Sequence, residues 1–244
     1  MSGTIAVLAP PFDISGEAAC SLLELADDEL IIGHRHSEWL GLSPFLEEDL
    51  AMASIAQDEL GHARALYALV WPGWADREAM IVRRPASAWR SGPLSEVATG
   101  AWEASLIRHL LHDISEELRW HSIVGAHTGS VPGLAELAAK VLAEERYHRR
   151  HAVDLVTRLG VGSPEANERL QVSLDRLWPL AVISLDAALI SAVGAAVGAV
   201  CADAGLVLPV VAEPPADRTI RHPDFAEVHA SLVEVVAIDP GATW

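Results

Sequence analysis

Two Glu-x-x-His motifs, Glu59 to His62 and Glu145 to His148, are the residues whose types and spacing are best suited to chemistry. Residues three positions apart lie on the same face of an α-helix. A carboxylate and an imidazole on one face can ligate the same divalent metal ion. An exposed polar pair gives the same pattern, so one motif alone does not indicate a metal site.

Each motif interrupts an apolar stripe of helical periodicity. The flanking residues are Met52, Ile55, Leu66 and Leu69 for the first motif, and Leu134, Ala138, Val141, Ala152, Leu155 and Leu159 for the second. Recurrence at intervals of three and four places each set on one buried helix face. Burying a carboxylate is costly unless a cation or a donor compensates it. The stripes therefore predict that both motifs face the interior beside a compensating cation.

A lone glutamate precedes each motif by a similar distance. Glu29 lies 30 residues before Glu59, and Glu116 lies 29 residues before Glu145. With a turn near Leu42, Glu29 and Glu59 come within roughly 6 Å of the same height along a helical hairpin. A second hairpin, with its turn near position 129, repeats the arrangement. The predicted metal ligands, which are also the candidate catalytic residues, are Glu29, Glu59, His62, Glu116, Glu145 and His148.

Four carboxylates and two imidazoles form the ligand set of dinuclear metal sites in four-helix bundles. Carboxylates offset the charge of two divalent ions and can bridge them, while imidazoles leave positions open for oxygen. Glu38 competes with Glu29 but lies about nine residues nearer the turn, roughly 13 Å away in height. Asp113 and Glu117 compete with Glu116, and the stripe does not choose among them.

Other polar residues near the motifs are expected to have lesser roles. Tyr147 could be a radical site, but a tyrosine between two ligands more often points to a neighbouring helix. The remaining histidines are expected at the surface or supporting the ligands. They include His34, His36, His109, His112 and His151.

The elements that must position these residues are helices, because the chain is rich in Ala, Leu and Val and poor in Phe and Tyr. We predict an all-α fold, a ferritin-like four-helix bundle with additional C-terminal helices, forming a single domain over 1–244. The bundle core spans about 15–160 and the C-terminal extension about 164–244. The expected helices cover about 15–40, 44–70, 93–127, 132–159, 164–183, 187–201 and 224–236, with irregular chain at 1–14 and 209–215.

The net charge of -17, with Lys140 as the only lysine, argues against binding to nucleic acid and to acidic lipid surfaces. The longest apolar run, Ala187 to Cys201, is shorter than the roughly 20 residues that a membrane span needs, so we expect a buried helix there. Two cysteines make no bridge framework, and the N-terminus shows no basic region followed by an apolar run. These features predict a cytoplasmic protein.

Several segments resemble the phenylacetyl-CoA epoxidase subunit family, PaaA and PaaC. They are LADDELIIGHRHSEWLG, LEEDLAMASIAQDELGHAR, EERYHRRHAVDLVTRLG and HPDFAEVHASLVEVVAIDPGATW. The resemblance implies a ferritin-like fold and two iron ions, although manganese or a mixed Mn/Fe pair would suit the same ligands. It further implies an oxygenase of phenylacetate catabolism, a monooxygenase or epoxidase that uses O2 as co-substrate on an aromatic acyl-CoA.

Length, the short first turn and the ending DPGATW resemble the partner subunit, PaaC, which typically has eroded ligands. QDELGH, Gln57 to His62, instead resembles QDEAGH of the catalytic subunit, and the family generally carries Asp at the position of Glu116. Residues 203–221 are compressed relative to PaaC. The expected partners are a separate reductase, since no flavin, nicotinamide or iron-sulfur motif is evident, and further subunits in a homo- or hetero-oligomer with a homologue. The alternatives are a non-catalytic structural subunit and a ferroxidase or iron-handling bundle.

Overall fold

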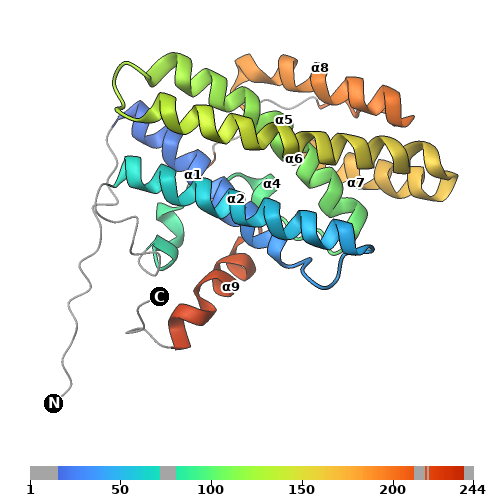
Figure 1. Cartoon of the computed structure of the whole chain (residues 1–244), viewed down its shortest axis with the longest axis horizontal. Helices are drawn as coiled ribbons and strands as arrows, with labels where there is room; N and C mark the ends of the chain where they lie inside the picture. Colours follow the sequence, from blue (N-terminus) through green and yellow to red (C-terminus); the bar gives the residue numbers. More distant parts are fainter. Residues whose placement is uncertain (1–15, 72–80, 212–217, 219, 239–244) are drawn as a thin grey trace.

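The described residues, 16–71, 81–211, 218 and 220–238 of the computed structural model, form helices and contain no strand. The predicted all-α fold is therefore confirmed. Figure 1 shows the elements, whose bounds are α1 Glu17–Ser37, α2 Leu46–Val70, η1 Ala86–Ala88, α4 Pro93–Glu96, α5 Trp102–His127, α6 Leu134–Gly162, α7 Pro164–Ile183, α8 Ala187–Ala204 and α9 Phe225–Ile238. The expected irregular residues 1–14 and the ending 239–244 lie outside the described residues, as does most of 209–215.

Two helical hairpins make the bundle, as predicted. α1 packs mainly against α2, and α5 packs mainly against α6. The first turn contains Gly41 at φ +76°, and the second ends at Gly133 at φ +83°, both in the left-handed region that glycine adopts without steric cost. α7 follows α6 directly, where the Ser163 hydroxyl accepts a hydrogen bond from Ala166 N and Pro164 opens the helix.

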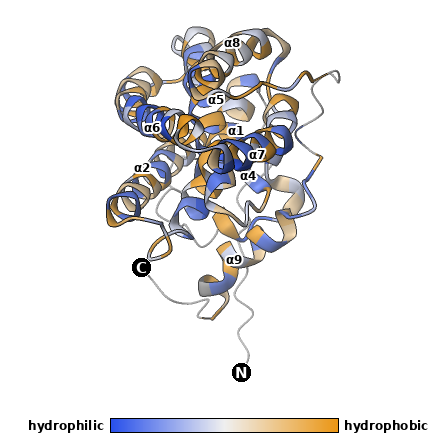
Figure 2. Cartoon of the chain, turned by 90° about the vertical axis from the view of Figure 1, so that its right-hand side faces the viewer, coloured by the Kyte–Doolittle hydropathy of each residue, from blue (hydrophilic) through white to orange (hydrophobic). Residues whose placement is uncertain are grey.

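The apolar core has two main parts. One part lies among α1, α2, α5 and α6 and includes Leu25, Leu66 and Trp120. The other lies among α5, α6, α7 and α8 and includes Leu110 and Val193. Seen from the end in Figure 2, α8 lies over the bundle on one side and α9 lies on the opposite side. Full burial of each such Leu or Val side chain contributes about 1.5–3 kcal/mol.

The helix predicted over 93–127 is broken, which corrects the sequence-based expectation. α4 ends at Glu96, and α5 begins at Trp102 after Gly100, whose φ is +69°. Distant side chains bond to the backbone at the break: Arg35 donates to Glu96 O at 2.9 Å, and Arg108 to Val97 O at 3.0 Å. These bonds satisfy carbonyls that a continuous helix would use.

The helix predicted from Ala187 forms, but it is not a buried helix. α8 buries one face, through residues such as Val193, Val197 and Val200, and leaves much of the opposite face at least partly exposed. By length and composition it could cross a membrane, and it is the one helix of the described ranges that passes this test. Its buried face packs on α5 and α6, as the outer helix of a layered domain does.

Candidate metal centre

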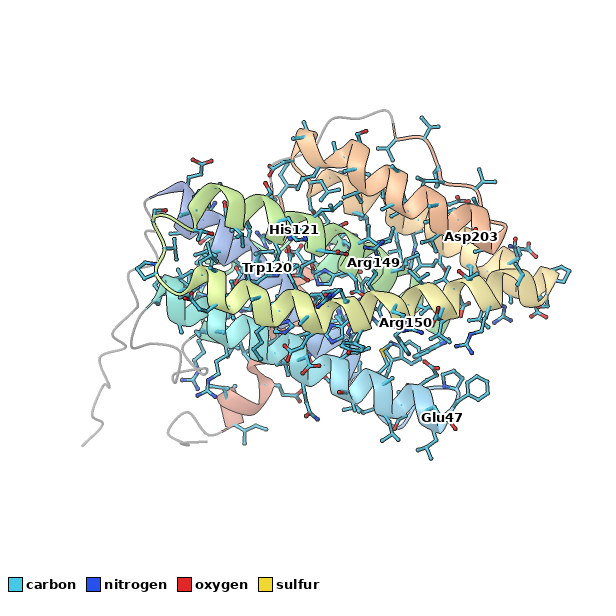
Figure 3. The ribbon with its side chains drawn as sticks, turned by 45° about the horizontal axis from the view of Figure 1, so that its top comes forward. Glu47, Trp120, His121, Arg149, Arg150 and Asp203 are labelled. Carbon is cyan, nitrogen blue, oxygen red and sulfur yellow. The ribbon has the colours of Figure 1, made fainter. Side chains whose placement is uncertain are left out.

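The six predicted ligands come together in the interior of the bundle. α1 supplies Glu29, α2 Glu59 and His62, α5 Glu116, and α6 Glu145 and His148. Their relative exposures are between 0% and 3%. In Figure 3 the labels Trp120 and His121 mark α5, and the labels Arg149 and Arg150 mark α6, which packs against it. The lengths of the two hairpins predict that the six side chains lie at the same height along the bundle. The structure agrees with this prediction.

One group of four ligand atoms has the size of a metal site. Atoms of Glu29, Glu59, His62 and Glu145 all lie within 4.8 Å of one another. Nδ1 of His62 lies 3.4 Å from Glu29 Oε2 and 3.5 Å from Glu145 Oε1. Because this group combines three carboxylates with one imidazole, it offers both charge compensation and a nitrogen ligand to a divalent ion.

The other imidazole lies on the far side of the two shared carboxylates. Nδ1 of His148 lies 3.2 Å from Glu145 Oε1 and 3.6 Å from Glu59 Oε1, and its ring centroid is 6.3 Å from that of His62. Glu59 and Glu145 thus each approach both imidazoles. This is the placement that bridging carboxylates need between two ions.

Glu116 extends the cluster along α5. Atoms of Glu29, Glu59, Glu116 and His112 form a second group within 4.8 Å, and His112 Nε2 lies 2.6 Å from Glu116 Oε2. His112 is 4% exposed. We expected this histidine at the surface or in a supporting position, whereas the structure places it among side chains that could themselves hold an ion.

The centre is deficient in hydrogen-bond donors. Both carboxylate oxygens of Glu29, Glu59, Glu116 and Glu145 are buried and find no hydrogen-bond partner within the described ranges. Nδ1 of His62 and Nδ1 of His148 are likewise buried and have no hydrogen-bond partner within the described ranges. Nearly all buried polar atoms in proteins are hydrogen-bonded, and the exceptions call for an ion or water. The unpartnered atoms are those that would face two cations, so the donor set fits a dinuclear metal site.

In the metal-free chain, protons bound to these side chains supply part of the positive charge that metal ions would otherwise provide. Burial, together with the neighbouring carboxylates of Glu116 and Glu59, raises the pKa of Glu29 well above its usual range. Burial also raises the pKa of Glu145 strongly, with a further contribution from Glu59. Burial lowers the pKa of His148, but its contacts with Glu145 and Glu59 outweigh this effect and raise the pKa to about 12. Divalent ions would displace these protons.

The outer nitrogen of each motif imidazole is bound by an acid from the opposite motif. His62 Nε2 lies 2.8 Å from Glu144 Oε2, and His148 Nε2 lies 3.3 Å from Asp58 Oδ2. A proton on Nε2 leaves Nδ1 as the metal-binding nitrogen. Neither acid was predicted from the sequence, although each directly precedes the glutamate of its own motif.

The acids that compete with Glu29 and Glu116 as candidate ligands differ in burial. Glu38 is ion-paired with Arg35 at 2.9 Å with its side chain 44% exposed, and Glu117 is ion-paired with Arg149 at 2.5 Å, so both lie outside the cluster. Asp113 is fully buried, and neither of its oxygens has a hydrogen-bond partner in the part of the chain described. It stays an alternative ligand on α5.

The other named side chains occupy different environments. Tyr147 is 75% exposed and so lies outside the buried cluster, which leaves the radical-site reading without structural support. His36 and His109 are fully buried, so of the surface and supporting positions that we expected, only a supporting position is left for them as a prediction. His34 and His151 are only partly buried.

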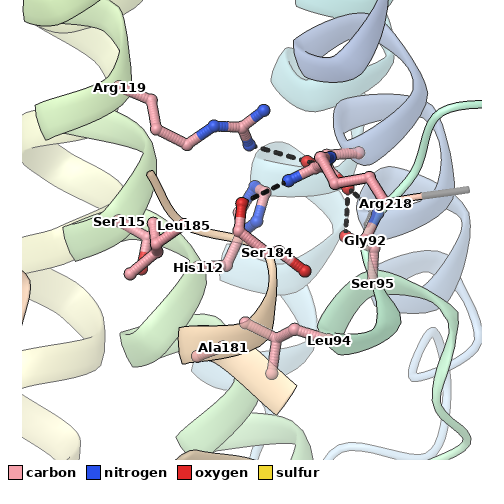
Figure 4. A pocket seen from close by; sticks show the side chains of 11 residues that line it. Gly92, Leu94, Ser95, His112, Ser115, Arg119, Ala181, Ser184, Leu185 and Arg218 are labelled. Carbon is pink, nitrogen blue, oxygen red and sulfur yellow. Dashed lines mark hydrogen bonds and ion pairs between the residues drawn. The ribbon is translucent and has the colours of Figure 1, made fainter. Parts of the chain in front are cut away.

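The two aspartates before Glu29 anchor α1 to distant segments. Asp27 accepts hydrogen bonds from Tyr67 and Arg84. Asp28 forms ion pairs with Arg119 and Arg218. All three residues line a cavity of about 20 Å³, in which Figure 4 labels the two arginines. These bonds fix the rotation of α1 one residue before the first ligand.

A larger cavity of about 300 Å³ lies between α2 and α6. Its lining includes Asp58, Glu144 and His148, and also Ile55 and Tyr147. The cavity therefore reaches His148 of the second motif and the two acids, Asp58 and Glu144, that contact the motif histidines.

Comparison with known proteins agrees with this architecture. The chain is 31% identical, over 169 residues, to the C-type subunit of the 1,2-phenylacetyl-CoA epoxidase of Escherichia coli (strain K12). The match covers 68% of this chain and 66% of that relative, slightly less than two thirds of its length. The profile of the family described as "Phenylacetic acid catabolic protein" matches residues 15–187, which include all six candidate ligands. The chain thus belongs to the phenylacetic acid catabolic protein family, whose known members include a phenylacetyl-CoA epoxidase subunit.

Proposed function

We propose that this chain is a dinuclear metal oxygenase of the phenylacetyl-CoA epoxidase type. The observation that carries the proposal is the complete set of buried ligands whose oxygens have no hydrogen-bond partner among the described residues. Two metal ions, iron by analogy and manganese as an alternative, would activate O2 for insertion of one oxygen atom into an aromatic acyl-CoA.

The chain's own residues would have separate tasks. Glu29, Glu59, His62, Glu116, Glu145 and His148 would hold the two ions, with Glu59 and Glu145 lying near both imidazoles. Asp58 and Glu144 would keep both imidazoles oriented. The packed apolar residues around the cluster would exclude water, which strengthens the electrostatic contacts within it.

The proposed reaction requires partner proteins. Insertion of one atom of O2 consumes two electrons, so a separate reductase would supply them. The relative is one component of a multi-subunit epoxidase, and this supports assembly of the chain with a homologous subunit.

A second candidate function is a structural subunit that binds a catalytic homologue. The similarity to the C-type epoxidase subunit favours it. The complete ligand set argues against it, because buried carboxylates without compensation would only destabilise a purely structural bundle.

The test uses the purified full chain, with and without a reductase and a homologous subunit. We expect bound iron and O2-dependent conversion of phenylacetyl-CoA to an oxygenated thioester, detected by mass spectrometry. Glu116→Gln should lose conversion, whereas Glu117→Gln, one residue away and outside the cluster, should retain it. Bound metal without conversion under any combination would favour the structural role.

A further inference from the structure

Two histidines and two acids form a second polar group that leads from the centre toward the surface. Asp113 and His109 lie on α5, His151 on α6 and Glu48 on α2. None of these four belongs to the proposed ligand set. The inner two, Asp113 and His109, are fully buried, whereas the side chains of His151 and Glu48 are partly exposed, at 21% and 14%.

The four side chains make an uninterrupted series of close approaches. His151 Nε2 lies 2.8 Å from Glu48 Oε2 in a hydrogen bond. The rings of His151 and His109 follow, with centroids 5.6 Å apart and planes inclined at 31°. His109 Nε2 lies 2.8 Å from Asp113 Oδ2. Each imidazole therefore has its Nε2 beside a carboxylate and its ring beside the other imidazole.

Several ring nitrogens of the series have no hydrogen-bond partner. Both nitrogens of His109 and Nδ1 of His151 are buried and find none in the described part of the chain, although His109 Nε2 lies close to Asp113 Oδ2. A histidine that only stabilised the fold would be expected to satisfy both nitrogens. Two adjacent rings with unpartnered nitrogens can instead pass a proton, since imidazole accepts at one nitrogen and releases from the other.

Both ends of the series are suitably placed. At the outer end, His151 lines the 300 Å³ cavity between α2 and α6. At the inner end, Asp113 is fully buried and lies on α5 three residues before Glu116, so the two carboxyl groups share one face of that helix. Burial raises the pKa of Asp113 above its usual range, and a carboxyl group in this position can hold and release a proton.

We propose that Glu48, His151, His109 and Asp113 form a proton relay between the α2–α6 cavity and the buried centre. The relay rests on the proposed function, because insertion of one oxygen atom consumes protons: substrate, O2, two electrons and two protons give oxygenated substrate and water. The electrons come from the reductase. At each transfer one N–H or O–H bond breaks and one forms. Asp113 gives its proton to the centre, His109 Nε2 then gives a proton to Asp113 Oδ2, His151 Nδ1 gives one to His109 Nδ1, and Glu48 returns one to His151 Nε2 from the cavity side.

His109 is suited to the middle position. Burial lowers its pKa to about 3, with a further contribution from the charge of His148. The ring is therefore neutral at physiological pH and keeps one nitrogen free to accept a proton. His36, whose ring centroid is 4.9 Å away and whose nitrogens also have no hydrogen-bond partner among the described residues, adds a buried side branch.

The test measures proton movement without metal. In metal-free full-length protein labelled with ¹⁵N in histidine, NMR gives the rate at which the His109 ring N–H exchanges with solvent. His151→Phe should slow this exchange by about tenfold or more, because positioned proton-transfer groups contribute on the order of 10²–10⁴-fold. His121→Phe, at an exposed position of α5, is the matched control and should not change the rate. Added imidazole should restore fast exchange in His151→Ala.

A second measurement separates the relay from the oxygenase proposal. In the iron-loaded chain, His151→Phe and Glu48→Gln should slow reoxidation of the reduced centre by O2 while the iron content stays at the wild-type level. Unchanged His109 exchange in a folded His151→Phe variant would overturn the relay even if the chain oxygenates its substrate. Slowed exchange in a chain that reacts with no acyl-CoA would instead support the relay and contradict the proposed function.

Discussion

Nε2 of His62 and Oε2 of Glu144 lie 2.8 Å apart and join α2 to α6 beside the candidate metal centre. The corresponding contact in the other direction joins His148 to Asp58. Each duplicated motif therefore contributes an acid that orients the imidazole of the other. This reciprocal arrangement means that loss of one acid disturbs the ligand on the opposite helix.

Asp58→Asn and Glu144→Gln should each weaken metal binding by about 10–100-fold, the usual effect of removing a partner of a ligating histidine. Glu136→Gln, an exposed acid on α6, is the control for the loss of one negative charge. Competition with a chromophoric chelator measures the affinities. Equal affinities in all three variants would mean that the acids do not position the imidazoles.

The α5 ligand can be identified by three substitutions. Glu116→Gln should lower the metal stoichiometry by about one ion, because Glu116 shares a group with Glu29 and Glu59. Asp113→Asn and Glu117→Gln should retain full stoichiometry. Metal analysis after dialysis decides the question, and a loss of metal in Asp113→Asn alone would move the ligand to that residue.

Metal loading should release protons at neutral pH. Burial raises the pKa of both Glu29 and Glu145 well above the usual range, so these carboxyls hold protons that a divalent ion must displace. Titration calorimetry in buffers of different ionisation enthalpy gives the number released. Zero release would contradict the protonated state of the metal-free centre.

Asp28→Asn should destabilise the chain by about 3–5 kcal/mol, because it leaves two arginines beside an uncharged group. Although burial opposes it, the charges of Arg218 and Arg119 hold the pKa of Asp28 below its usual value. A lowered folded pKa gives stabilisation that is complete above the unfolded pKa of about 3.9 and is lost as the pH falls below it.

Denaturation at several pH values checks this prediction. The stability difference between wild type and Asp28→Asn should be largest near neutral pH and shrink as the pH falls through about 4. Glu24→Gln is a suitable control, since Glu24 contacts Arg218 only at 3.9 Å. A pH-independent difference would mean that the charge of Asp28 is not what stabilises the chain.

The placement of the ligands could be predicted from the sequence because it depends on two regular features. Helical periodicity fixes which face Glu59 and His62 share, and the length of each hairpin fixes the height of the lone glutamate. Both features are local. For this reason the predicted height along the hairpin correctly favours Glu29, which lies beside His62, over Glu38, which pairs with Arg35.

Features that depend on distant contacts could not be predicted. The break before α5 depends on Arg35 and Arg108, whose side chains bond to carbonyls of other segments. The exposed face of α8 depends on which helices pack against it. Likewise, Asp58 and Glu144 gain their role only when α2 and α6 lie side by side.

The central claim is that this bundle holds two metal ions, and the metal content of the purified full chain tests it most directly. Elemental analysis together with iron or manganese titration should give two ions per wild-type chain and a clear loss in Glu59→Ala, which removes a carboxylate shared by both imidazoles. A folded wild-type chain that binds no metal, or a Glu59→Ala variant that keeps both ions, would contradict the account.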